Sequence, residues 1–206
     1  MPLIYNIANP IQWSVLGKPV YADTNVISPI FYDRSGSVPD QGRMLALQPY
    51  YTAIADMFSN GVQLHLSSIV LMELCNVFLK WDRKIYNYSK PKGQKVDDPK
   101  AFRELLSEKQ SRKARYSLIL SQINSASCFK LHEIVIHPLD AIAYAYTIDR
   151  HSMDTNDYIL SQFVASQNGI LLTDDHDFSS APTGCDLMTN NPRLVSEAVQ
   201  AGFALV

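Results

Sequence analysis

The sequence predicts an α/β fold in which helices cover both faces of a mostly parallel sheet. Short apolar segments typical of buried strands alternate along the chain with longer segments of helical periodicity. Strands of a parallel sheet are covered on both faces, which makes such segments continuously apolar. With 206 residues, 47% of them apolar and 18% charged, the chain suits one globular domain and differs from a disordered polypeptide.

Each predicted element of the first half ends at a recognisable signal. A buried strand runs into the polar turn Asp23-Thr24-Asn25, and a helix stops at Asn60-Gly61. The predicted order is a strand at 20–23, a helix at 43–59, a strand at 62–66 and a helix at 69–83.

The second half continues the alternation after an exposed loop. The helix at 69–83 follows a serine that can cap it, Ser67 or Ser68. Residues 89–99 are rich in Lys, Gly and Pro and predict a loop, and Gly169 is a helix stop. The further elements are a helix from Asp98-Pro99 to about Asn124, a strand at 129–136, a helix from Pro138, a helix at 156–168, strands at 170–173 and 186–189, and a helix from Pro192 to about Gln200.

The composition excludes several classes of protein. No stretch of 18 or more residues is free of charged or strongly polar side chains, so a membrane span is not expected. Residues 1–17 have no basic residue before their apolar part, and we interpret them as part of the domain. Three cysteines without a CxxC motif favour a reducing, cytoplasmic location over a disulfide framework.

Charge is distributed unevenly along a chain whose formal net charge is −2. Residues 80–115 hold 12 of the 18 basic and five of the 20 acidic side chains, so that this segment carries +7 and the rest −9. One interpretation is an arm that binds a polyanion beside an acidic centre. The other is a solvated helical hairpin, since Lys and Arg favour helices.

Four carboxylates stand at or beside the ends of predicted strands. Asp23 and Asp175 each end a strand, Glu73 is the one acid among apolar positions of its helix, and Asp157 begins the helix that Gly169 closes. Functional groups in a parallel sheet gather beyond the carboxyl ends of its strands. A cluster of carboxylates is unfavourable unless cations neutralise it, and oxygen ligands favour Mg²⁺ or Mn²⁺.

Three segments carrying these acids resemble the PIN-domain nucleases. They are ADTN at 22–25, the lone acid in SSIVLMELCNVF at 67–78, and DYILSQFVASQNGILLTDDHDF at 157–178. The family's last segment ends in T-x-D-x-D-F, which is filled here by Thr173, Asp175, Asp177 and Phe178. Single motifs of this length are weak, and their order along most of the chain is what makes the resemblance specific.

The resemblance implies a Rossmann-like three-layer α/β/α sandwich formed by one domain, residues 1–206, with a basic helical insertion at about 80–125. It implies a metal-dependent endoribonuclease whose ions activate water and stabilise the leaving 3′ oxygen, giving 5′-phosphate and 3′-hydroxyl ends. Many small bacterial members are VapC-like toxins, so RNA, a protein antitoxin and a second copy of the chain are candidate partners. The basic insertion makes this chain longer than the compact toxins.

Roles follow for individual residues. The candidate metal ligands and catalytic residues are Asp23, Glu73, Asp157 and Asp175. Asp154 is either a further ligand or the cap of the helix that Asp157 begins, and Asp177 either supports the metal or bonds its loop. Thr24, Asn25 and Thr173 are expected to orient carboxylates or water, Asp174 to be solvated, and His176 to be a bystander. The candidate RNA-binding residues are Arg112, Lys113 and Arg115.

Two alternatives remain open at this level. The first is a PIN-fold binding or regulatory module that does not use its acids catalytically. The second is phosphoryl transfer through an aspartyl-phosphate, although Asn25 stands where the D-x-D pattern of such enzymes needs a second acid.

Overall fold

The structure is a computed structural model that describes residues 1–32, 41–136, 138–147, 153–180 and 184–206. It contains one seven-stranded sheet with the strand order β4-β3-β2-β5-β6-β1-β7, in which all neighbouring strands are parallel. The strands are β1 (Leu3–Asn6), β2 (Val20–Ala22), β3 (Leu64–Ser67), β4 (Phe129–His132), β5 (Ile170–Leu172), β6 (Asp186–Thr189) and β7 (Ala204–Leu205). The predicted α/β class with a parallel sheet is confirmed.

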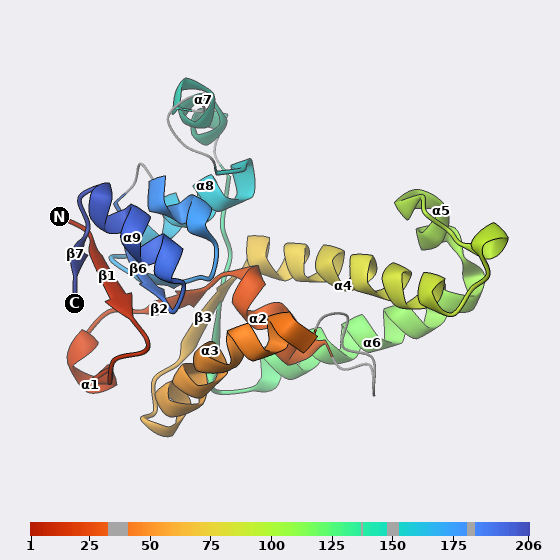
Figure 1. The fold of residues 1–206 in the computed structure, drawn as a ribbon, viewed down its shortest axis with the longest axis horizontal. Helices are drawn as coiled ribbons and strands as arrows, with labels where there is room; N and C mark the ends of the chain where they lie inside the picture. The colour runs from red at the N-terminus through yellow and green to blue at the C-terminus, as the bar shows by residue number, and fades with distance from the viewer. Residues whose placement is uncertain (33–40, 137, 148–152, 181–183) are drawn as a thin grey trace.

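Helices connect the strands and flank the sheet (Figure 1). The α-helices are α1 (Trp13–Leu16), α2 (Thr24–Phe31), α3 (Gln41–Ser59), α4 (Ser68–Tyr88), α5 (Pro99–Glu104), α6 (Leu106–Ser125), α7 (Pro138–Thr147), α8 (Thr155–Ser166) and α9 (Pro192–Gln200). Two short 3₁₀ helices, η1 (Lys92–Gln94) and η3 (His176–Ser180), complete the described elements. No described helix is long and apolar enough to cross a membrane.

Both faces of the sheet are packed against helices. On one face Tyr21 of β2 meets Phe163 of α8 edge to face, with ring centroids 5.5 Å apart. On the other, Phe129 of β4 packs against Phe31 of α2 at 5.5 Å and Phe58 of α3 at 5.6 Å. This arrangement is consistent with a Rossmann-like three-layer sandwich, and it leaves the carboxyl ends of the strands for polar groups.

A helical arm extends away from the sheet. Figure 1 shows α4 and α6 running outward, with α5 at the far end of the arm. The buried carboxylate of Asp82 on α4 ties the arm to the body, because it accepts hydrogen bonds from Tyr32 Oη (2.7 Å), from Tyr116 Oη (2.9 Å) and from the Arg115 guanidinium. Buried charges are stable only when they are paired in this way.

Several predicted boundaries differ from the structure. The helix expected from residue 98 to 124 is divided into α5 and α6 at Leu105, whose φ and ψ are −61° and 108°. The strand expected at 129–136 ends at His132. The short strands β1 and β7, and the helix α2 after the Asp23 turn, were not predicted. The two-residue β7 carries too few residues for a pattern, and α2 contains Pro29.

Gly169 has a role that differs from the expected helix stop. The left-handed position after α8 belongs to Asn168, at φ 50°. A Cβ on Gly169 would lie 2.7 Å from Cε2 of Tyr21, so the glycine is required by the close approach of β5 to that ring.

Candidate metal centre

The sheet brings three of the four predicted acids to one edge. Asp23 directly follows β2, and Asp175 lies three residues after the end of the neighbouring strand β5. Glu73 lies in the second turn of α4, which begins at once after β3 on the other side of β2. These strands are parallel, so their carboxyl ends meet on the same side of the molecule.

Thr173 connects the two strand ends. Its hydroxyl donates to Asp23 Oδ2 at 2.9 Å and accepts from the backbone N–H of Asp175 at 3.0 Å. Both Asp23 and Thr173 are buried, at 2% and 0% exposure. The predicted orienting role of Thr173 therefore has a defined geometry: it fixes one carboxylate and the turn that carries the other.

Thr24 and Asn25, which follow Asp23, each bond to another candidate metal ligand. Thr24 Oγ1 donates to Glu73 Oε2 at 2.9 Å, and Asn25 Nδ2 donates to Asp175 Oδ2 at 3.2 Å. The expected turn is the start of α2, with Asp23 at its N-cap. The side chains of all three residues thus bond to segments distant in sequence.

Asp23 and Asp154 both occupy helix N-cap positions but use their carboxylates differently. Asp154 accepts hydrogen bonds from the backbone N–H groups of Asn156 (2.8 Å) and Asp157 (3.0 Å). Asp23 makes no such side-chain cap on α2, and its carboxylate instead faces Thr173. The capping alternative thus describes what Asp154 does in this structure, whereas Asp23 is held for another purpose.

Electrostatic coupling shows that Asp157 joins the same cluster. Burial, together with the charges of four negative side chains, raises its pKa to about 8. In decreasing order of effect, these are Asp23, Asp154, Asp175 and Glu73. Among the described residues, no group donates a hydrogen bond to the Asp157 carboxylate, which leaves its charge uncompensated.

The pKa values of Asp23 and Glu73 are raised as well. Burial raises the pKa of Asp23 to about 7, the hydrogen bond from Thr173 opposes the rise, and the charges of Glu73 and Asp175 add to it. Burial also raises the pKa of Glu73, with Thr24 and the positive charge of Lys80 opposing. Asp23 and Asp157, which would hold protons near neutral pH, belong to a site that a divalent cation would stabilise in its ionised form.

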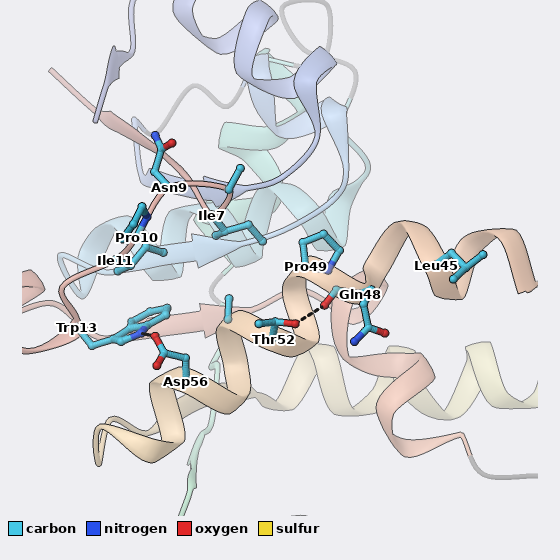
Figure 2. Close-up of a pocket in the computed structure, with 12 residues that line it drawn as sticks. Ile7, Asn9, Pro10, Ile11, Trp13, Leu45, Gln48, Pro49, Thr52 and Asp56 are labelled. Carbon is cyan, nitrogen blue, oxygen red and sulfur yellow. Dashed lines mark hydrogen bonds between the residues drawn. The ribbon is translucent and has the colours of Figure 1, made fainter.

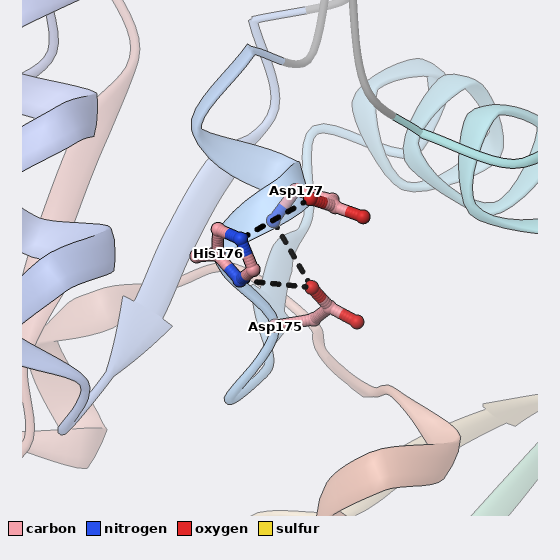
Figure 3. Close-up of side chains that lie close together, drawn as sticks. All are labelled: Asp175, His176 and Asp177. Carbon is pink, nitrogen blue, oxygen red and sulfur yellow. Dashed lines mark hydrogen bonds and ion pairs between the residues drawn. The ribbon is translucent and has the colours of Figure 1, made fainter.

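A second feature of the site is the cluster Asp175, His176 and Asp177 (Figure 3). Nδ1 of His176 lies 3.7 Å from Asp175 Oδ1, and Nε2 lies 3.5 Å from Asp177 Oδ1. Within the described part of the chain, this is the one group of three whose ligand atoms all lie within 4.8 Å of one another. The structure places His176, which the sequence analysis expects to be a bystander, between the carboxylates of Asp175 and Asp177. Whether it binds an ion stays a prediction.

The donor set fits a hard divalent cation. Asp23, Glu73, Asp157 and Asp175 offer carboxylate oxygens, which Mg²⁺ and Mn²⁺ prefer, and one imidazole beside them is compatible with Mn²⁺. The four acids are coupled without being drawn into contact, as expected for like charges that repel one another.

Asp174 is not simply solvated, as was expected. Its Oδ1 accepts a hydrogen bond from Tyr50 Oη at 2.7 Å, and the same hydroxyl lies 2.9 Å from Thr189 Oγ1. Tyr50 thereby joins α3 to the ends of β5 and β6. Asp174 faces away from the acidic cluster into this structural contact.

Two of the three predicted RNA-binding residues are internal. Arg112 is only 6% exposed and donates to the backbone carbonyls of Phe102 (3.3 Å) and Arg103 (2.9 Å). Arg115 pairs with the buried Asp82. The arm uses these two guanidinium groups to pack α6 against α5 and α4. That they also bind phosphates stays a prediction. Lys113 is exposed, and its role stays a prediction.

None of the four candidate acids lines the cavity shown in Figure 2. The cavity has a volume of about 670 Å³ and lies between α3 and the loop after β1. Its carboxylate, Asp56, accepts a hydrogen bond from Trp13 Nε1 at 2.6 Å. A single engaged acid among mostly apolar side chains does not form a second metal centre.

No protein-family model matches the chain, and a search of curated proteins finds no significant match.

Proposed function

We propose that this protein is a metal-dependent endoribonuclease that hydrolyses phosphodiester bonds of RNA. The observation that carries the proposal is the turn Asp23-Thr24-Asn25, whose three side chains bond to Thr173, Glu73 and Asp175. The turn gathers acids from separate strands and helices into one charged centre, which a fold alone does not require. The segments that resemble PIN-domain motifs contain these same residues.

Asp23, Glu73, Asp157 and Asp175 would hold Mg²⁺ or Mn²⁺, and Asp154, His176 and Asp177 are the further titratable groups close to them. When bound, such a cation supplies Lewis-acid activation of water and neutralises charge on the reacting phosphate. The chain's own contribution is positioning. Thr173, Thr24 and Asn25 fix the orientation of the carboxylates, so little reorganisation is needed during the reaction.

The cellular role that we propose is that of a toxin of a toxin–antitoxin pair or a related RNA-cleaving effector in the cytoplasm. RNA is the proposed substrate, and a protein antitoxin and a second copy of the chain are proposed partners. Three cysteines without a CxxC motif support a reducing compartment. The basic arm supports an anionic partner.

The test is cleavage of end-labelled single-stranded RNA by the purified protein. We expect cleavage in Mg²⁺ or Mn²⁺, 5′-phosphate ends on the products, and loss of activity in EDTA. Asp23→Asn, purified in the same way, is the control for contaminating nuclease. Full cleavage in EDTA would contradict the proposal, and metal-independent RNA binding without any cleavage would favour the binding-module alternative.

A further inference from the structure

A cationic pocket lies in the arm, between α4 and α5. Its volume is about 380 Å³, and no acidic side chain lines it. The lining residues are Asn76, Leu79, Lys80, Arg83, Pro99, Phe102 and Arg103. Three cations and an amide around one concave site form a donor set suited to a phosphate group.

The pocket and the acidic centre share one face of α4. Asn76 and Lys80 follow Glu73 by three and seven residues, a spacing that places all three side chains on the same side of a helix. Seven residues span about 10 Å along a helix axis. Lys80 is close enough for its charge to oppose the rise in the pKa of Glu73. The pocket is therefore the cationic site nearest to Glu73 along this face of the helix.

The cations of the pocket are available to a ligand. Lys80 and Arg103 are exposed, and neither forms an ion pair with any residue in the described part of the chain. Arg83 uses one guanidinium nitrogen to donate to the carbonyl of Asp97, which orients its group beside the pocket.

A buried charge lies behind the pocket. The guanidinium carbon of Arg112 is 4.7 Å from the ring centroid of Phe102, which lines the pocket. Nη1 of Arg112 is buried and has no hydrogen-bond partner among the described residues. A buried cation without a carboxylate is unfavourable, and an anion in the adjacent pocket would relieve part of that cost. Arg112 also holds the backbone of Arg103 in place.

We propose that this pocket binds a backbone phosphate of the RNA strand whose neighbouring segment lies at the acidic centre. The inference rests on the proposed function and adds the site that grips the substrate. An acidic centre repels a polyanion, so attraction must come from cations close by. Phe102 is fully buried, which leaves no aromatic face in the pocket for base stacking, and recognition is therefore independent of base sequence.

An acidic protein segment would also be attracted to these cations. The strand of a nucleic acid fits the observations better, because the pocket continues the same helix face that carries Glu73. An RNA strand that extends along α4 from the bond being cleaved places its next phosphates at the pocket. A protein partner would not need this alignment.

The test uses the full chain with Lys80→Ala and Arg103→Ala combined. Neither side chain forms a hydrogen bond or ion pair within the described part of the chain, and Lys80 acts on Glu73 only through its charge. The bond from Arg112 goes to the backbone of residue 103, so the fold should be retained. The matched control combines Lys92→Ala and Lys95→Ala, which removes the same charge from exposed positions of the same arm outside the pocket. The melting temperature of each variant checks folding.

The measurement is the affinity for fluorescein-labelled single-stranded RNA in EDTA, read by anisotropy over a range of salt concentrations. Each single-strand phosphate contact contributes about 0.7 to the slope of log affinity against log salt, so two lost contacts reduce the slope by about 1.4 and weaken binding about 25-fold at 0.1 M salt. The control variant should stay within about threefold of wild type, since distant exposed charges are screened.

Three results would overturn the pocket proposal: wild type that does not bind the RNA, equal losses in the two double variants, or tighter binding of poly-glutamate than of RNA at the same salt. The last would assign the pocket to an acidic protein partner. Cleavage in Mn²⁺ is measured separately. Wild type that binds RNA through the pocket but never cleaves it would refute the proposed function and leave the pocket established.

Discussion

We expect Asp175→Asn to reduce RNA cleavage by at least about a hundredfold and Asp174→Asn to leave it close to that of wild type. Asp175 belongs to the coupled carboxylates and accepts the hydrogen bond from Asn25. Its neighbour Asp174 accepts from Tyr50 Oη, and the carbonyl oxygen of an asparagine can accept the same bond. The measurement is the initial rate of cleavage of end-labelled RNA in Mn²⁺.

Asp174→Asn is a strict control for Asp175→Asn because each change removes one negative charge from the same turn. Melting temperatures of the two variants show whether either affects folding. Loss of cleavage in Asp174→Asn with retention in Asp175→Asn would mean that the turn after β5 presents the other acid to the substrate.

The second large effect is on stability in the absence of divalent cations. In EDTA we expect the melting temperature to fall as the pH rises from about 6.5 to about 9. Below about pH 6.5 the lowered pKa values of His65 and His132 act in the opposite direction. Burial and mutual repulsion raise the pKa values of Asp23 and Asp157 to about 7 and about 8, so the folded state binds more protons than the unfolded state between about pH 4 and these values. The stability that the protonated groups contribute is complete below about pH 4 and is lost as the pH rises through both values.

Mg²⁺ reverses this trend because the ligands must be ionised to bind it. Its stabilising effect should be larger at about pH 8 than at about pH 6, since protons compete with the cation. Asp157→Asn should remove part of the decline in EDTA and much of the response to Mg²⁺. A melting temperature that does not change with pH in EDTA, or a decline that Asp157→Asn leaves intact, would contradict the coupling of these acids.

The sequence was sufficient for the fold class and for nominating the acids. Acids at the ends of short apolar strands reach one edge of a parallel sheet whatever the details of the helices, and the structure brings Asp23 and Asp175 together there. Glu73 was identifiable because a single acid among apolar helix positions must face something polar. Each of these inferences depended on local pattern and on the topology of parallel sheets.

Other features depend on contacts that no local pattern reveals. Arg112 and Arg115 belong to a strongly basic segment, yet their guanidinium groups pack inside the arm against Phe102 and Asp82. Composition cannot distinguish an exposed cation from one that joins two helices. Local pattern also does not reveal the role of Gly169. Its lack of a side chain leaves room for the ring of Tyr21, whereas the sequence pattern indicates only a helix stop.

The most direct test of the central claim is Mn²⁺ binding to the purified protein, followed by electron paramagnetic resonance of the free ion. The claim is that the Asp-Thr-Asn turn gathers Asp23, Glu73, Asp157 and Asp175 into one cation site. We expect saturable binding by wild type and by Asp174→Asn, and a loss of at least about tenfold in affinity in Asp23→Asn. Equal binding by wild type and Asp23→Asn, or no binding by either, would contradict the claim.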